Sequence, residues 1–144
     1  MPPVVMVFKG AEADFTGNTL RGSGVAGIRA EGTVRVTNNT FETPGLRTVG
    51  PPQFAVWGLP GSDIVFTDNK VSGWRHALVA EKAGVTACYN RVTNYGTVAI
   101  KVDQPIGTPM IIGNVLESER DREGIAISGG EGVVRNNRVE LPNP

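Results

Sequence analysis

An asparagine with the same apolar neighbours returns six times along the 144-residue chain. In every repeat, uncharged and mostly apolar residues stand five and three positions before the asparagine, and an apolar residue stands two positions after it. The positions between them are mixed and polar, and such alternation with a period of two indicates β-strands. The six asparagines are Asn18, Asn39, Asn69, Asn90, Asn114 and Asn137.

The length of the repeat indicates the architecture. Successive asparagines are 21, 30, 21, 24 and 23 residues apart, a period typical of solenoids in which each repeat forms one coil. Asparagine suits a corner because it tolerates the left-handed backbone conformation and because its amide can hydrogen-bond to equivalent amides in neighbouring coils. We therefore predict about six coils with an asparagine ladder at one corner.

A further apolar segment precedes most repeats and predicts a third strand in each coil. Three short strands per coil, stacked at about 4.8 Å, would form three parallel sheets around an apolar interior. We expect an all-β chain with one domain over residues 1–144, which is either complete or a section of a longer solenoid. The expected first-sheet strands are residues 4–8, 27–31, 55–58, 77–81, 98–101 and 124–128.

The phrase Gly-Ile-Arg-Ala-Glu at residues 27–31, followed by Thr-Val-Arg-Val-Thr-Asn-Asn-Thr-Phe at 33–41, resembles the right-handed parallel β-helix superfamily of pectate lyases, alginate epimerases and tailspikes. Leucine-rich repeats share part of this spacing and remain an alternative. They require another leucine eight positions before the asparagine, where this chain has glycine, charged residues or one isoleucine. The resemblance therefore favours the β-helix.

Composition restricts the partners that we expect. Fourteen basic and 14 acidic residues cancel, and the arginines are dispersed, which argues against a nucleic-acid partner. No long apolar run or basic leader is visible, so we expect a soluble chain without a membrane partner, cytoplasmic by default. The single cysteine, Cys88, cannot form an intramolecular disulfide or a multi-thiolate metal site. We expect no cofactor and no metal.

The resemblance places a binding groove along the first sheet. Aromatic rings there would stack on sugar faces or anchor a protein partner. We expect exposed ligand-binding side chains at Arg29, Trp57, Trp74 and Tyr95, with packing over the turns as the alternative for Trp74 and Tyr95. An insertion at residues 43–53 leads into the Trp57 strand, and long loops often carry binding sites.

Catalysis has weaker support in the sequence. The candidates are Glu31, Glu81, Lys101, Asp103 and His76. Glu31 and Glu81 would lie two coils apart, about 10 Å, slightly beyond the carboxyl separation of inverting glycosidases. We expect Glu81 to pair with Lys101 on the neighbouring coil, and we expect the lone His76 to be a hydrogen-bonding residue of a turn. The resemblance implies several calcium-binding aspartates for a lyase, and only Asp103 is present.

The leading interpretation is a non-catalytic β-helix module that binds a glycan or protein through the first-sheet face. Self-association is predicted through the edge strand from Val4 to Phe8, or through outward apolar residues of the second sheet. The alternatives are a polysaccharide-active lyase, epimerase or hydrolase, and a structural section of a tailspike-like or adhesin-like protein. The residues of the second-sheet patch are Val65, Met110, Ile112 and Val133.

Overall fold

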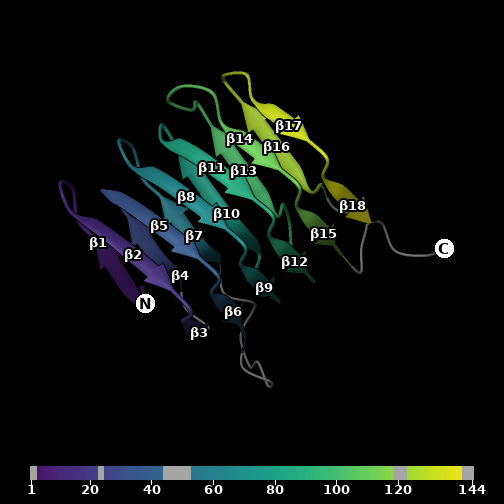
Figure 1. The fold of residues 1–144 in the computed structure, drawn as a ribbon, viewed down its shortest axis with the longest axis horizontal. Coiled ribbons are helices and arrows are strands. Elements are labelled where there is room, and N and C mark those ends of the chain that lie inside the picture. Colours follow the sequence, from purple (N-terminus) through teal and green to yellow (C-terminus); the bar gives the residue numbers. More distant parts are fainter. Residues whose placement is uncertain (1–2, 23–24, 44–52, 119–122, 141–144) are drawn as a thin grey trace.

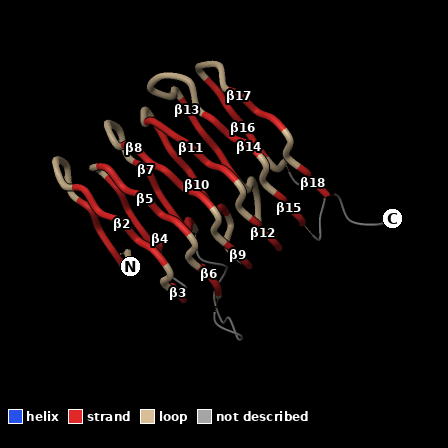
Figure 2. The backbone as a smooth tube through the Cα atoms, in the orientation of Figure 1, coloured by secondary structure: helices blue, strands red, loops and turns tan. Residues whose placement is uncertain are grey.

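The computed structural model describes residues 3–22, 25–43, 53–118 and 123–140, and these residues form strands and turns (Figures 1 and 2). Among them no helix occurs, and so none that is long and apolar enough to cross a membrane. The insertion expected at residues 43–53 and the proline-containing segment at 141–144 lie, apart from Thr43 and Gln53, outside the described residues.

The strands form three parallel sheets of six strands each. The first sheet contains β1 (Val5–Val7), β4 (Ala26–Ala30), β7 (Phe54–Gly58), β10 (His76–Glu81), β13 (Ile100–Asp103) and β16 (Ile125–Ser128). The second contains β2 (Glu12–Thr16), β5 (Thr33–Thr37), β8 (Asp63–Thr67), β11 (Gly84–Cys88), β14 (Met110–Ile112) and β17 (Val133–Arg135). The third contains β3 (Thr19–Arg21), β6 (Thr40–Glu42), β9 (Lys70–Ser72), β12 (Arg91–Thr93), β15 (Val115–Glu117) and β18 (Arg138–Glu140).

The chain contributes one strand to each of the three sheets in turn and then begins the next coil. Each strand therefore pairs with the strand three places later in the chain, as β1 pairs with β4. The N- and C-terminal coils lie at opposite ends of the stack (Figure 1). Six strands in each sheet correspond to five coil-to-coil steps. The predicted all-β solenoid is confirmed, and the three parallel sheets, with no helix among the described residues, argue against the leucine-rich repeat.

Inward and outward side chains alternate along the strands, and the inward ones form the core. In β5 and β8 the inward residues Val34, Val36, Ile64 and Phe66 are fully buried, while their neighbours face out. The register stacks each inward residue on its equivalent in the next coil, as in the pairing of Val36 with Phe66. The interior is thus one continuous apolar column, which accounts for most of the hydrophobic stabilisation.

The asparagine ladder forms at the corner between the second and third sheets. Each ladder amide Nδ2 donates to Oδ1 of the next ladder asparagine, at 2.9–3.2 Å in all five steps. Asn90 shows the full pattern: its Nδ2 also donates to the Phe66 carbonyl, and its Oδ1 accepts from the Asn69 backbone N–H. Asn39, Asn69, Asn90 and Asn114 are at most 1% exposed. Their buried polar groups are therefore satisfied by one another and by the backbone.

The sequence prediction placed the left-handed conformation on the ladder asparagines, and this detail is wrong. The positive φ belongs to the preceding residue in every coil. The left-handed residue makes the turn, and the asparagine after it extends its side chain into the corner. The six left-handed residues are Gly17 (72°), Asn38 (57°), Asp68 (56°), Tyr89 (59°), Gly113 (70°) and Asn136 (56°).

A second column of small residues lies where the chain bends into the first sheet. Gly27, Ala55, Ala77, Ala99 and Gly124 are buried there, each just before a larger inward residue. A Cβ on Gly27 would lie 2.7 Å from the Ala55 carbonyl oxygen, which is too close without a shift of the backbone. Two consecutive buried positions fit at this bend because the first of them is small.

We predict that Asn90→Ala lowers the free energy of unfolding by about 3 kcal/mol, because several buried donors and acceptors lose their partners. Asn18→Ala is the matched control, since Asn18 is exposed and ends the ladder. Its cost should stay below about 1 kcal/mol. Urea unfolding followed by circular dichroism measures both values, and equal losses would contradict a stabilising role for the buried amides.

Candidate functional site: the first-sheet face

The outward side chains of the first sheet form two rows that run across the strands. The register aligns Arg29 of β4 with Met6 of β1 and with Trp57 of β7. The same row continues through Val79 of β10 and Lys101 of β13. Side chains in such a row stand one strand spacing apart, so residues from different coils become direct neighbours.

Arg29 and Trp57 form a stacked pair at the centre of this face. The guanidinium carbon of Arg29 lies 5.1 Å from the centre of the Trp57 ring, which is a cation–π contact. On the other side Arg29 Nη1 donates to Met6 Sδ at 3.9 Å. Arg29 Nε is buried and makes no hydrogen bond with the described residues. The guanidinium is thus held by soft apolar neighbours, without a described carboxylate partner.

Two further rings extend this cluster along the sheet. Phe54 lies 5.2 Å from Trp57 and stacks at 5.4 Å on the imidazole of His76, measured between ring centres. Sequence reasoning missed Phe54 and Met6 as members of the site. The signal available for Met6 was its position, equivalent to Arg29 and Trp57 in their coils.

His76 uses both ring nitrogens for hydrogen bonds. Its Nδ1 lies 2.6 Å from the Val98 carbonyl oxygen and donates to it, which leaves Nε2 of the neutral ring to accept from the Thr97 hydroxyl at 3.2 Å. Burial lowers the pKa of His76 below its ordinary value. The bond to Val98 raises the pKa, and the charges of Lys101 and Arg75 lower it further. This geometry suits the hydrogen-bonding role expected for a lone histidine better than that of a general base.

The expected exposure of Trp74 and Tyr95 is wrong, and the alternative, packing of these side chains at the turns, is confirmed. Trp74 is 1% exposed and Tyr95 is 3% exposed, and both belong to the apolar core. Trp74 packs edge-on against the ring of Phe41, with the ring centres 6.3 Å apart. These aromatic residues lie in the turns between the third sheet and the first sheet. Trp57 is the half-buried tryptophan on the outer face.

The acidic candidates occupy the second outward row. Glu31, Leu59 and Glu81 directly follow the register partners Ala30, Gly58 and Ala80, so Leu59 separates the two glutamates as expected. Glu81 is in register with Asp103. Asp103 Oδ1 accepts a hydrogen bond of 2.7 Å from the Ser128 hydroxyl.

The expected ion pair between Glu81 and Lys101 is absent from the described residues. Lys101 is in register with Val79, and Glu81 faces Asp103 instead. The two-residue offset along the strand puts the lysine in the other outward row. Within the described part of the chain, no group of three or more His, Cys, Asp or Glu side chains is placed to hold a metal ion.

The outward apolar residues of the second sheet also lie together. Val65, Met110 and Val133 belong to one row, with Thr86 between the first two, and Ile112 stands in the row beside it. Met110 is 37% exposed, and Tyr89 at the adjoining corner is 62% exposed. At the first-sheet edge, Val4 and Phe8 on either side of β1 are also exposed.

Comparison with known proteins adds one finding to this geometry. A family model described as a right-handed β-helix region matches residues 4–143, which is nearly the whole chain. The search of curated proteins gave no match, and the search of solved structures gave none either. The match covers all 18 described strands and supplies the hand of the coil, so this chain belongs to the right-handed β-helix family.

Proposed function

We propose that this protein is a binding module that recognises a glycan through the first-sheet face, without catalysing a reaction. The observation that supports the proposal is the Arg29–Trp57 stack. A guanidinium that lies on an indole and has no described carboxylate partner offers a planar set of donors to a ligand. Sugar hydroxyl and carboxylate oxygens are acceptors that suit these donors.

The surroundings of the stack support recognition of a ligand that runs across the strands. Arg29 and Lys101 lie in the same outward row, separated by Trp57 and Val79. Two cations with apolar surface between them can contact polar groups at both ends and a sugar ring in the middle. The short strands and the stacked coils hold these side chains on rigid backbone, which lowers the entropic cost of binding.

We expect glycan binding to change the fluorescence of Trp57 and to depend on Arg29. Wild-type protein is screened against neutral and uronic-acid oligosaccharides, and any ligand found is titrated into Arg29→Ala. The affinity should fall at least about tenfold, the scale of one lost charge-assisted hydrogen bond. Trp57→Phe should remove the fluorescence change, because the remaining Trp74 is buried.

Arg35→Ala provides the matched control, because Arg35 is an exposed arginine on the second sheet. It should bind like the wild type. If no oligosaccharide in the screen binds, or if Arg29→Ala and Arg35→Ala bind equally well, the proposed function is wrong. If a protein binds through Arg29 and no glycan does, the partner is a protein and the glycan proposal is wrong.

Self-association through the second-sheet patch is the second part of the proposal. The patch is the set Val65, Met110, Ile112 and Val133. Outward positions of a solvent-facing sheet usually carry polar residues, so an apolar cluster there is a candidate for burial against a second copy of the chain. The N-terminal half of the same face is polar, with Asp14, Thr16 and Arg35, and this contrast limits the interface to one half of the sheet.

We predict that Met110→Glu shifts an oligomer to the monomer, because an interface carboxylate would lose its hydration without gaining a partner. Multi-angle light scattering at several protein concentrations measures the mass. Thr16→Glu places the same charge on the polar half of this sheet and should leave the mass unchanged. A monomeric wild type at all concentrations would contradict this part of the proposal.

An enzymatic alternative has one specific observation in its favour. Glu81 and Asp103 are register partners on adjacent strands, about 4.8 Å apart at the backbone. Retaining glycosidases place their two carboxyl groups about 5–5.5 Å apart. The pair is therefore a better candidate for acid and nucleophile than the Glu31–Glu81 pair, which Leu59 separates.

Under the binding proposal, the wild type should leave neutral and uronic-acid polysaccharides intact, as judged by reducing-end and unsaturated-product assays. Should turnover appear, Glu81→Gln or Asp103→Asn would reduce it at least a hundredfold, because each removes one of two reacting groups. Glu31→Gln serves as the control on the same row. Turnover that resists both substitutions would exclude the carboxylate pair as its source.

A further inference from the structure

A hollow on the outer face of the third sheet is distinct from the first-sheet site. Its volume is about 270 Å³, and it crosses β6, β9 and β12. The inward residues beneath it, Phe41 and Val71, are buried in the core. The floor is therefore firm, and the outward side chains determine what the hollow can bind. These outward residues are Thr40, Glu42, Lys70, Ser72, Arg91 and Thr93.

The hollow exists because two short side chains interrupt a row of long ones. Ser72 and Thr93 are register partners, with Glu42 on the preceding strand and Glu117 on the following one. The other residues of this row have longer side chains, namely Arg21, Glu42, Glu117 and Glu140. Ser72 and Thr93 have short side chains, and the hollow lies over them.

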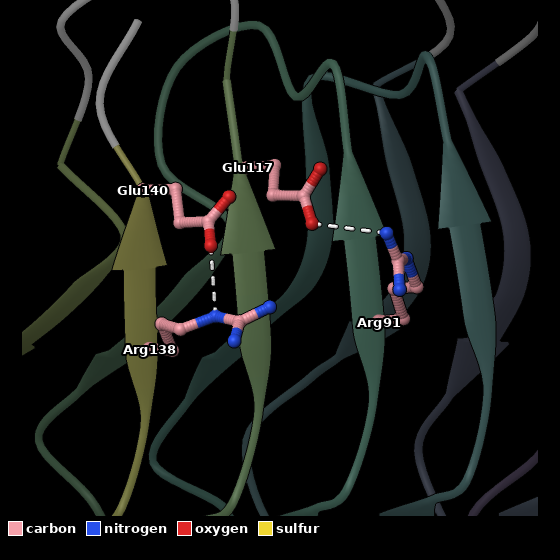
Figure 3. Close-up of polar contacts among 4 residues, drawn as sticks. All are labelled: Arg91, Glu117, Arg138 and Glu140. Atoms are coloured by element: carbon pink, nitrogen blue, oxygen red, sulfur yellow. Dashed lines mark hydrogen bonds and ion pairs between the residues drawn. The ribbon is translucent and has the colours of Figure 1, made fainter.

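Ion pairs hold the walls on both sides. Arg21 Nε lies 3.1 Å from Glu42 Oε1, and Arg91 Nη2 donates to Glu117 Oε1 at 3.0 Å (Figure 3). Figure 3 shows that Arg91 and Glu117 reach toward each other across the gap between β12 and β15, outside the sheet. Each pair joins neighbouring strands, so both walls are cross-linked to the coils next to the hollow.

Three side chains inside these walls, those of Lys70, Ser72 and Thr93, have no polar partner among the described residues. Lys70 is in register with Arg91, which places two cations on adjacent strands. Arg91 is paired with Glu117, whereas the side-chain ammonium group of Lys70 makes no ion pair or hydrogen bond within the described part of the chain. The hydroxyls of Ser72 and Thr93 likewise make no hydrogen bond to any described residue. One uncompensated positive charge and two hydroxyls therefore face the same space.

We infer that this hollow is a second binding site, and that its ligand is a sugar unit that carries a carboxylate. Lys70 would bind the carboxylate, and Ser72 and Thr93 would donate to or accept from ring hydroxyls. The carboxylate of Glu42 is a good acceptor for a sugar hydroxyl. The stems of Lys70 and Arg91 and the threonine methyl groups offer apolar contact to the C–H face of a sugar ring.

The size of the hollow fits a small ligand. A volume of about 270 Å³ lies just below the roughly 300–1,000 Å³ of pockets for drug-sized ligands, which suits one or two sugar rings. A site this shallow and exposed binds weakly on its own. It would act together with other sites on the same polymer, so that several weak contacts give a useful affinity.

Amide NMR with a triuronic-acid oligosaccharide as probe tests the inference. The probe should shift the backbone signals of Lys70, Ser72 and Thr93 in a saturable way, and Lys70→Met should weaken this binding at least about tenfold. Lys9→Met removes an exposed lysine outside the hollow and should bind as the wild type does. Arg29→Ala should leave these third-sheet shifts intact, which separates this site from the first-sheet site.

Ser72→Leu fills the hollow and should abolish the same shifts. Unchanged signals of the buried ladder amides Asn69 and Asn90 would show that each variant keeps its fold. The inference is overturned if Lys70→Met binds like the wild type, or if the neutral trisaccharide binds equally well. It is also overturned if inorganic sulfate binds as tightly as the triuronic acid, since the sugar would then contribute nothing.

Discussion

Each coil of this protein is fixed to the next by a buried asparagine amide that bonds both its neighbouring amides and the backbone. In the middle of the ladder, Asn69 and Asn90 leave no side-chain donor or acceptor unsatisfied. A slip of one residue in any coil would remove these bonds and would also turn the apolar row toward water. The ladder therefore sets the register of all three sheets, and the register decides which outward side chains meet.

Both candidate sites follow from this fixed register. Arg29 and Trp57 are 28 positions apart in the sequence, and they touch because their coils are aligned residue for residue. Lys70 and Arg91 are neighbours for the same reason. These residues belong to the second, third and fourth coils, whose ladder residues Asn39, Asn69 and Asn90 are almost completely buried. The sites thus lie where the backbone is best supported, which favours preorganised side chains.

The sequence predicted the features that repeat, because a repeat can be compared with itself. The six asparagines, the inward apolar positions and the outward place of Trp57 all follow from alignment of the coils. The same alignment could have predicted that Glu81 stands beside Asp103 and not beside Lys101, because Val79 and Lys101 occupy equivalent positions in consecutive coils. The ion pair was expected because opposite charges attract, but register alone decides which residues stand side by side.

The features that do not repeat could not be predicted in the same way. Trp74 and Tyr95 lie in turns of different sequence, and both are buried, Trp74 against the ring of Phe41. The residue with positive φ is glycine, asparagine, aspartate or tyrosine in different coils, so its residue type does not identify it. The ladder residue after it is asparagine in every coil, and the left-handed conformation was therefore assigned to that asparagine. In a solenoid, a residue type that is the same at equivalent positions of every coil supports the fold. A coil that carries a different residue type at such a position is where a binding site can form. Ser72 and Thr93 among charged neighbours, and Arg29 against an indole, are departures of this kind.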